Sequence, residues 1–127
     1  MEGKITAVSI SLSDGTSYSG DITEGALTGT ANIKYSNGDQ YSGSVVDGVR
    51  SGTGTYVWAS GASYDGGWAE GLMSGSGTYT YSSTDNGYKL VGTFENGYPS
   101  GECKFYSTAY KYYKTDWSNG KCVKIYE

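Results

Sequence analysis

The sequence predicts an all-β fold: an elongated, twisted antiparallel meander of about five tandem β-hairpins, whose single sheet carries an aromatic groove. Three observations lead to this prediction. The motif Tyr-x-Gly-x-apolar-x-x-Gly begins at Tyr18, Tyr41 and Tyr64, so it returns every 23 residues. The 127 residues include 21 Gly and 14 Tyr but one Pro, a composition that indicates many tight turns between aromatic strands. Gly-containing turn pairs separate segments in which polar and apolar residues alternate. A step of this size is typical of a repeat architecture, in which one unit cannot bury its apolar face alone.

One domain, 1–127, is expected, built from related units in series. An irregular apolar run at 5–12 ends at the Asp14-Gly15 turn and is expected to form a cap strand, since terminal repeats are usually atypical. The fourth copy of the motif begins 26 residues after the third, so three extra residues have entered within 82–86. The expected units are an N-terminal cap strand (1–17), four repeats (18–40, 41–63, 64–89 and 90–112) and a C-terminal capping repeat (113–127).

Each repeat is expected to be a β-hairpin. Asn-Gly and Asp-Gly pairs supply the positive φ that tight hairpin turns require. Such pairs occur at both ends of the expected strands, and no segment between them is long enough for a crossover helix, so about eleven strands should pair in an antiparallel meander. The turn pairs are Glu24-Gly25, Asp47-Gly48, Glu70-Gly71, Asn96-Gly97 and Asn119-Gly120 at one end, and Asp14-Gly15, Asn37-Gly38, Ser60-Gly61 and Asn86-Gly87 at the other.

Aromatic and aliphatic residues recur in columns on one side of the expected sheet, whereas the other side is largely Ser, Thr, Asp and Lys. Glycines recur between these columns, which favours an arrangement in which rings lie over bare backbone and the sheet bends. Large aromatics bury about 150–250 Å² each, so this face is expected to supply most of the stability. The columns are Tyr18, Tyr41, Tyr64, Leu90 and Tyr113; Ile22, Val45, Trp68, Phe94 and Trp117; Ile33, Tyr56, Tyr79 and Phe105; and Tyr35, Trp58 and Tyr81.

The segment from Tyr64 to Tyr79, YDGGWAEGLMSGSGTY, resembles the MORN repeat, the membrane occupation and recognition nexus motif. The resemblance extends from Tyr18 to Asn119 and weakens where Thr115 replaces a motif Gly. It implies a twisted sheet of tandem hairpins with an aromatic groove. Arrays of this family act as protein-binding, lipid-binding or scaffolding parts, often beside a separate catalytic domain, and no segment of this sequence resembles such a domain.

The composition argues against an enzyme. The chain has no His, which is the commonest general base and metal ligand. Most carboxylates fall at turns or on the polar side, and the Gly-x-Gly pairs lack the following helix of a phosphate-binding loop. No catalytic, metal or cofactor site is therefore expected.

The two cysteines are too few for a zinc site. Cys103 and Cys122 are expected to be small core residues, with a disulfide across the last hairpin as the alternative. No apolar run approaches the ~20 residues of a membrane helix, and the N-terminus does not resemble a signal peptide. We expect a cytoplasmic protein, or a secreted or surface-exposed one if a signal segment has been removed.

The charge is unevenly distributed along the chain. Residues 1–100 carry a net charge of −6 and residues 101–127 a net charge of +2. The acidic body argues against nucleic acid binding, whereas the basic end suggests weak binding to anionic lipids. The lysines of this end are Lys104, Lys111, Lys114, Lys121 and Lys124, and the last four are the expected lipid contacts.

The leading functional hypothesis is a noncatalytic binding or scaffold module that takes an extended peptide or a helix of a protein partner in the groove. An exposed apolar face on a single sheet usually marks an interaction site, and Tyr and Trp are enriched at binding hot spots. The column of Tyr18, Tyr41 and Tyr64 repeats as a core column would. Trp58 is the preferred candidate, because it alone carries the larger ring in a column with Tyr35 and Tyr81. The expected groove residues are Tyr41, Tyr56, Trp58, Tyr64, Trp68, Tyr79 and Tyr81.

Two alternatives remain open. The same rings suit a small ligand such as a glycan, a nucleotide or a choline-like cation. The outer strands, expected at 5–12 and 122–126, could also pair edge to edge in a homodimer.

Overall fold

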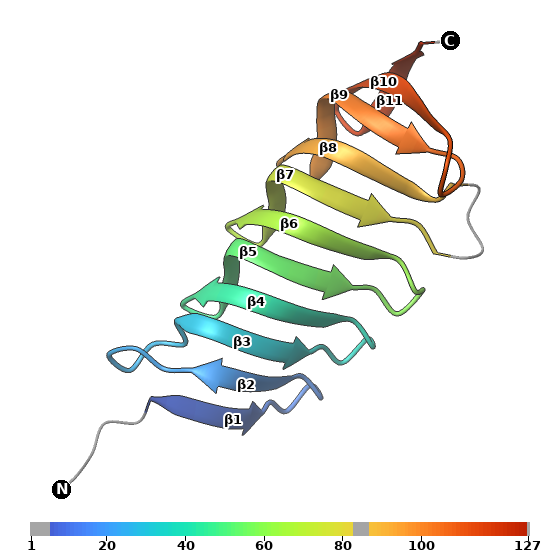
Figure 1. Ribbon diagram of the computed structural model, residues 1–127. Helices are drawn as coiled ribbons and strands as arrows, with labels where there is room; N and C mark the ends of the chain where they lie inside the picture. The colour runs from blue at the N-terminus through green and yellow to red at the C-terminus, as the bar shows by residue number, and fades with distance from the viewer. Residues whose placement is uncertain (1–5, 83–86, 127) are drawn as a thin grey trace, which may run out of the picture.

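The described residues of the protein, 6–82 and 87–126 of a computed structural model, form one antiparallel sheet of eleven strands. Each strand pairs only with its neighbours in the sequence, in the order β1 to β11, so the predicted meander is confirmed (Figure 1). Among these residues no helix is long and apolar enough to cross a membrane. The strands are β1 (Ala7–Ser11), β2 (Ser17–Asp21), β3 (Gly29–Lys34), β4 (Gln40–Val46), β5 (Val49–Val57), β6 (Ser63–Ala69), β7 (Leu72–Thr80), β8 (Lys89–Glu95), β9 (Tyr98–Tyr106), β10 (Tyr112–Ser118) and β11 (Lys121–Ile125).

The predicted turn pairs adopt the backbone conformation that their chemistry favours. Asp47 and Gly48, between β4 and β5, have φ of 51° and 79°, the positive values of a type I′ hairpin turn. Four further pairs repeat this geometry along one edge of the sheet: Glu24-Gly25, Glu70-Gly71, Asn96-Gly97 and Asn119-Gly120. At the opposite edge Gly15, Gly38 and Gly61 have φ near 100°. Asn86 and most of the expected insertion at 82–86 lie outside the described residues.

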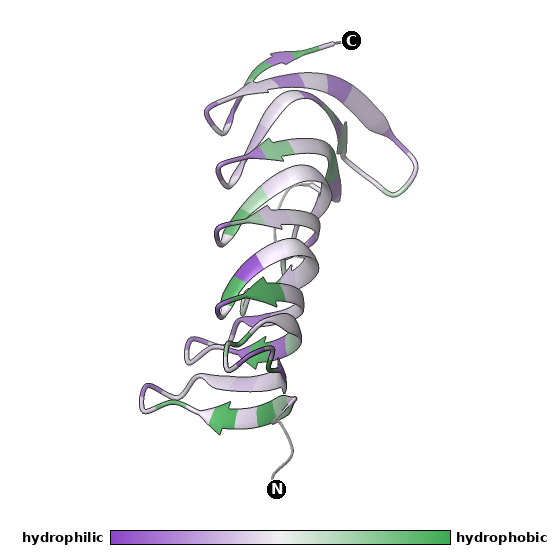
Figure 2. Ribbon diagram, turned by 90° about the vertical axis from the view of Figure 1, so that its left-hand side faces the viewer, coloured by the Kyte–Doolittle hydropathy of each residue, from purple (hydrophilic) through white to green (hydrophobic). Residues whose placement is uncertain are grey.

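The sheet bends across its strands. The register shifts between Gly43 and Val45 and between Gly66 and Trp68, and these bulges bend the hairpins. The Tyr41 hydroxyl donates a hydrogen bond to the Ser44 carbonyl (2.7 Å) beside the first bulge. The perpendicular view shows the strands as stacked arcs (Figure 2). A bent sheet gathers the rings of one face, which is how a single layer forms a core.

Glycines make room for the tyrosine rings. A Cβ at Gly54 would collide with the Tyr41 ring, and one at Gly77 would collide with the Tyr64 ring. Tyr41 and Tyr64 are 2% and 0% exposed, so each ring is fixed where the backbone is bare. The expectation that rings lie over glycine backbone is confirmed at these two places.

The fourth repeat solves the same packing problem with different residues. Leu90 stands where the earlier copies have tyrosine, and Cys103 stands where they have the second glycine. Cys103 is buried opposite Gly92, where its Sγ fills the space that a tyrosine ring would otherwise need. A smaller residue in place of the tyrosine thus accompanies a larger residue in place of the glycine.

The cysteines correct one expectation. Cys103 is buried as expected, but Cys122 is exposed and both thiols are free. Cys122 lies on β11, an edge strand whose residues are all exposed, so nothing packs over its side chain. The alternative disulfide is not formed.

Both outer strands leave one edge unpaired among the described residues. β1 covers Ala7–Ser11 of the cap strand expected at 5–12, and Ile5 lies outside the described residues. β11 covers most of the expected 122–126 strand. Their pairing in a homodimer remains a prediction.

Candidate functional site

The aromatic residues of the middle repeats form one continuous network on one face of the bent sheet, the face that carries the aromatic columns, which we call the inner face. Trp68 lies edge-on to Tyr41 and Tyr64, with ring centroids 5.6 and 5.3 Å apart. Trp58 lies 4.8 Å from Tyr56 and 5.3 Å from Tyr79. These separations and tilted or edge-on geometries are the favoured arrangement of aromatic pairs, so the contacts stabilise the network.

The structure brings all seven predicted groove residues together but at different depths. Tyr41, Tyr64, Trp68 and Tyr56 are between 0% and 9% exposed and belong to the core. Burial raises the pKa of Tyr41 to about 12, because ionising the phenol there would leave a charge out of water. Trp58, Tyr79 and Tyr81 are half-buried and pack on that core. A ligand in the groove would therefore meet these three rings first.

Sequence reasoning missed Arg50, which lies on the aromatic face. Its guanidinium carbon lies 4.9 Å from the centroids of both Tyr56 and Trp68 and 5.7 Å from that of Tyr35. Its nitrogens donate hydrogen bonds of 2.7 Å to the Tyr35 hydroxyl and the Gly71 carbonyl, and its Nε is buried without a partner. The chain thus supplies its own cation to a cage of three rings.

A buried carboxylate stands beside this cage. Asp39, 7% exposed, accepts hydrogen bonds from the Tyr56 hydroxyl (2.6 Å) and the Ala59 amide (2.8 Å). Burial alone would raise the pKa of Asp39, but these hydrogen bonds, one from Asn37 and the charge of Arg50 outweigh it, so the pKa is lowered. Burial, together with the hydrogen bond from the Tyr56 hydroxyl to Asp39, raises the pKa of Tyr56. The negative charge of Asp39 balances that of Arg50, and its hydrogen bond with the Tyr56 hydroxyl holds the Tyr56 ring in place.

A pocket of about 240 Å³ opens on the inner face farther along the sheet. It is mostly apolar, because aromatic rings and aliphatic side chains of β7 to β10 form its walls. Two of the predicted residues, Tyr79 and Tyr81, lie in it. Its lining residues are Met73, Tyr79, Tyr81, Leu90, Phe94, Gly97, Pro99 and Trp117.

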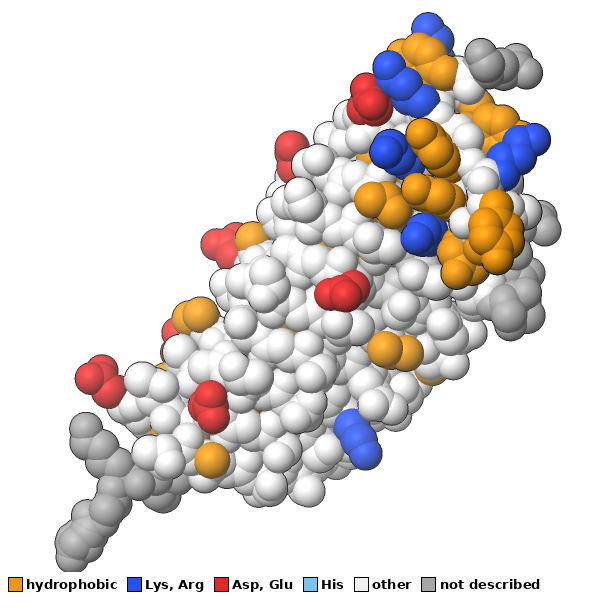
Figure 3. Space-filling view, viewed as in Figure 1, with side chains coloured by type: hydrophobic (Ala, Val, Ile, Leu, Met, Phe, Trp, Pro, Cys, Tyr) orange, Lys and Arg blue, Asp and Glu red, His pale blue; other side chains and the backbone are white. Residues whose placement is uncertain are grey.

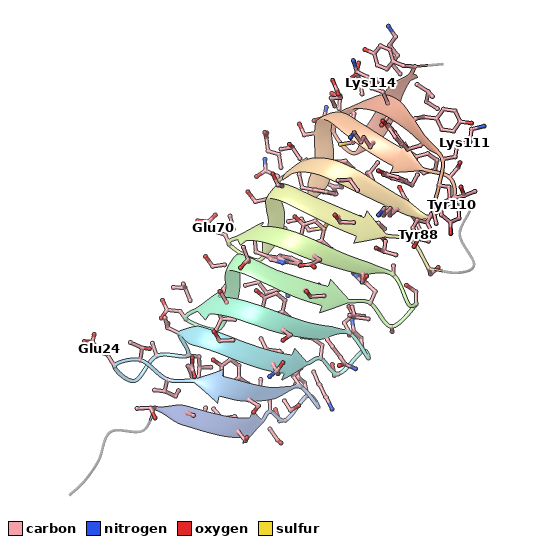
Figure 4. All side chains as sticks on the ribbon, in the orientation of Figure 1. Glu24, Glu70, Tyr88, Tyr110, Lys111 and Lys114 are labelled. Atoms are coloured by element: carbon pink, nitrogen blue, oxygen red, sulfur yellow. The ribbon has the colours of Figure 1, made fainter. Side chains whose placement is uncertain are left out.

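Carboxylates follow the edge formed by the type I′ turns. Glu24, Asp47 and Glu70 occupy the first turn position in successive repeats, and Glu95 precedes the next turn. All four are exposed. Glu24 and Glu70 lie along the same edge of the sheet in Figure 4. We call these four residues the acidic rim.

A second surface gathers lysine and hydrophobic side chains over β8 to β11, on the face shown in Figure 3. Lys89 lies 4.8 Å from the Tyr106 centroid, and Lys104 lies 5.1 Å from that of Tyr112. Lys114 lies 4.6 Å from the Tyr126 centroid. We call this set of lysines and tyrosines the Lys–Tyr surface. Elsewhere this face shows scattered acidic side chains and few lysines or arginines (Figure 3).

The four lysines predicted to contact lipid do not form one cluster. Lys114 and Lys124 share Tyr126, with Nζ 4.6 and 4.5 Å from its centroid, and Lys114 also forms a 3.4 Å ion pair with Glu102. Lys111 precedes β10 and lies over Tyr113, whereas Lys121 begins β11 beside the last turn. Lys89 and Lys104, outside the predicted set, contribute more directly to the Lys–Tyr surface.

Among the described residues, no group of three or more His, Cys, Asp or Glu could hold a metal ion. What the inner face offers chemically is aromatic surface, a pocket and backbone carbonyls. Such a site binds apolar groups and flat cations.

Comparison with known families supports the repeat assignment. The family model of the MORN repeat matches three consecutive segments, 41–63, 64–85 and 91–109, which together make up half of the chain. No curated protein matches the chain. The matched segments contain Trp58, Tyr79, Tyr81 and the acidic rim residues from Asp47 onward.

Proposed function

The chain belongs to the MORN-repeat family, and on this premise we propose that it is a noncatalytic binding module that holds a peptide segment of a protein partner in its aromatic groove. MORN repeats in general are protein- or membrane-binding units without catalysis. One observation carries the choice of the groove. The half-buried ring of Tyr79 contacts the rings of Trp58 and Tyr81, and Tyr79 and Tyr81 line an apolar pocket. No second layer of described residues covers this face of the sheet.

The size of the pocket favours a side chain over a whole small molecule. Pockets for drug-sized ligands measure about 300–1,000 Å³, and this one measures about 240 Å³. The other aromatic cage, at Tyr35, Tyr56 and Trp68, already holds Arg50, so a choline-like cation would have to displace it. A peptide needs room for only one side chain at a time and can use the remaining rings as a platform.

The proposal is tested with a random peptide library selected on the immobilised protein. Selected peptides are synthesised, and their affinity is measured by fluorescence anisotropy. Trp58→Ala is expected to weaken binding at least tenfold with a melting temperature within a few degrees of the wild type. Tyr112→Ala, a matched removal of a ring on the other face, is expected to leave the affinity unchanged.

Tyr81→Ala serves as the second groove variant should Trp58→Ala unfold the protein. The proposal fails if the library yields no binder above background. It also fails if the selected peptides bind a folded Trp58 or Tyr81 variant as tightly as the wild type.

A second function, weak binding to anionic membranes, is favoured by the Lys–Tyr surface. Tyr88 and Tyr112 are 44% and 50% exposed beside Lys89 and Lys104, and Tyr110, in the segment before β10, is 97% exposed. Tyr and Lys together suit a lipid headgroup region, and each Lys near an anionic surface contributes about 1 kcal/mol. Sedimentation with vesicles of phosphatidylserine and phosphatidylcholine should increase with the anionic fraction and disappear at high salt. Sedimentation that is independent of charge, or no sedimentation, would exclude this function.

A further inference from the structure

The pocket is the counterpart, one repeat later, of the place that Arg50 fills. We define a repeat counterpart as the residue 23 positions later, or 26 where the three-residue insertion intervenes. By this rule Met73 corresponds to Arg50, Tyr79 to Tyr56, Phe94 to Trp68 and Gly97 to Gly71. Arg50 contacts the rings of Tyr35, Tyr56 and Trp68 and donates hydrogen bonds to the Tyr35 hydroxyl and the Gly71 carbonyl. The counterparts of Tyr56, Trp68 and Gly71, together with Met73, line the pocket, whereas the counterpart of Tyr35 is Trp58, which has no hydroxyl and is not a lining residue.

Smaller residues explain why this place is empty in the later repeat. Phe94 replaces the larger ring of Trp68, and Leu90 replaces Tyr64. Met73 replaces Arg50 with a shorter side chain that carries no guanidinium. The pairing of β5 with β6 recurs between β7 and β8, with Gly52 opposite Trp68 and Gly75 opposite Phe94, so the volume lost from the side chains remains as a cavity.

The Arg50 site shows which chemical group can bind among residues like those of the pocket. At Arg50 a guanidinium lies over two rings and donates a hydrogen bond to a turn carbonyl. In the pocket, Tyr79 and Phe94 are the counterpart rings, and Gly97, the counterpart of Gly71, lines it as well. A flat cation that stacks on rings is typically a guanidinium, since an ammonium is more strongly hydrated and cannot stack.

Charge on the same side of the molecule favours a basic ligand. The acidic rim follows the edge of the sheet at which the Gly71 and Gly97 turns lie. Residues 1–100 carry a net charge of −6. A cationic peptide would therefore be attracted toward this side of the groove before any side chain enters the pocket.

We propose that the pocket lined by Met73, Tyr79, Phe94 and Gly97 receives the guanidinium of an arginine from a basic partner peptide, which reproduces in trans the contacts with two rings that Arg50 makes in cis. The acidic rim binds the neighbouring cationic residues of the same peptide. This inference rests on the proposed function of the groove and specifies its partner.

The test uses fluorescein-labelled hexa-arginine and hexa-lysine as probes, with fluorescence anisotropy in 150 mM salt. Wild-type protein is expected to bind hexa-arginine at least fivefold more tightly than hexa-lysine, because the two probes have equal charge and only one stacks. Equal affinity for the two probes, or no binding of hexa-arginine, would overturn the proposal.

Two substitutions place the same positive charge inside and outside the pocket. Met73→Arg places a guanidinium of the chain itself in the pocket and is expected to weaken hexa-arginine binding at least tenfold. Leu72→Arg adds the same charge at the adjacent residue, which is 47% exposed and alternates to the other face, and is expected to weaken binding less than threefold. Equal effects of the two substitutions would contradict insertion into the pocket.

A third variant opens the counterpart site. Arg50→Met is expected to create a second pocket, so the stoichiometry of hexa-arginine should rise by isothermal titration calorimetry. If Arg50→Met unfolds the protein, the comparison of Met73→Arg with Leu72→Arg decides the proposal alone. Library peptides that lack arginine but compete for the pocket would refute the arginine inference and leave the proposed groove function intact, whereas a groove that binds no peptide refutes both.

Discussion

The packing between Tyr64 and Gly77 makes a quantitative prediction about stability. A Cβ added at Gly77 would lie 2.5 Å from Cε1 and Cζ of the Tyr64 ring. The ring cannot move away, because it is fully buried and packed against Trp68 and Phe94, with centroids 5.3 and 4.9 Å distant. Overpacking of this kind costs about 1–3 kcal/mol, from which the lower entropy of unfolded Ala recovers about 0.4–1 kcal/mol. Gly77→Ala should therefore lower the free energy of unfolding by about 1–2 kcal/mol.

The fourth repeat indicates a compensating change. Its Leu90 and Cys103 correspond to Tyr64 and Gly77, so a smaller residue at the first position admits a larger one at the second. Tyr64→Leu alone removes ring contacts and the hydrogen bond from the hydroxyl to the Gly67 carbonyl (3.0 Å), a loss of about 2–3 kcal/mol. In the Tyr64→Leu background, Gly77→Ala should cost close to nothing.

The assay is urea denaturation at 25 °C, followed by tryptophan fluorescence and far-ultraviolet circular dichroism. The wild type, both single variants and the double variant form a double-mutant cycle, and the expected coupling energy is about 1–2 kcal/mol. Additive costs would refute the reasoning, as would a Gly77→Ala variant as stable as the wild type.

Three further predictions concern buried groups. Asp39→Ala should lower the free energy of unfolding by about 2 kcal/mol in urea denaturation, because it leaves the Tyr56 hydroxyl and the Ala59 amide unpaired. The control Asp65→Ala, at an exposed residue, should change the free energy of unfolding by less than about 0.5 kcal/mol. Equal effects of the two substitutions would contradict the role of Asp39. Since folding raises the pKa of Tyr41 to about 12, the stability that its neutral phenol contributes is complete below pH 10 and is lost as the pH rises toward 12. The melting temperature should fall across that range, and less so in Tyr41→Phe; a flat profile would argue against the buried phenol. With Ellman's reagent, exposed Cys122 should react at once and buried Cys103 only after denaturation; two fast thiols, or none, would contradict the structure.

The regular part of the fold could be predicted because local chemistry determines it. Asp47-Gly48 and its counterparts need positive φ, and the structure has it at each of the five predicted pairs on that edge. The 23-residue step then sets which residues share a face, since each hairpin repeats the last. The strand order follows from turns at both edges, because no described segment could carry a strand elsewhere.

Arg50 could have been found from the sequence but was missed. It alternates with Gly52, Gly54 and Tyr56 on β5, which places it on the aromatic face. Its column, which continues with Met73 and Pro99, mixes charged and apolar residues and therefore carries no visible pattern. Contacts with ring faces and a hydrogen bond to a turn carbonyl stabilise an arginine at this core position, and the hydropathy pattern of a sequence does not reveal such contacts.

The pocket could not be predicted. It depends on the volume difference between Trp68 and Phe94 and on how far the Met73 side chain reaches, and these are properties of packing in three dimensions. The spread of the C-terminal lysines was likewise hidden. Lys111 precedes β10 and lies over Tyr113, whereas Lys114 lies within β10 and over Tyr126.

The most direct test of the groove as a binding site is a titration of ¹⁵N-labelled protein with unlabelled hexa-arginine, followed by amide chemical shifts. The largest shifts are expected at the amides of Met73, Tyr79, Phe94 and Gly97, and these shifts should be absent in Met73→Arg. Shifts confined to the exposed tips at Glu24, Asp47 and Glu70, equal in wild type and Met73→Arg, would contradict binding in the groove, because the peptide would then bind by surface charge alone.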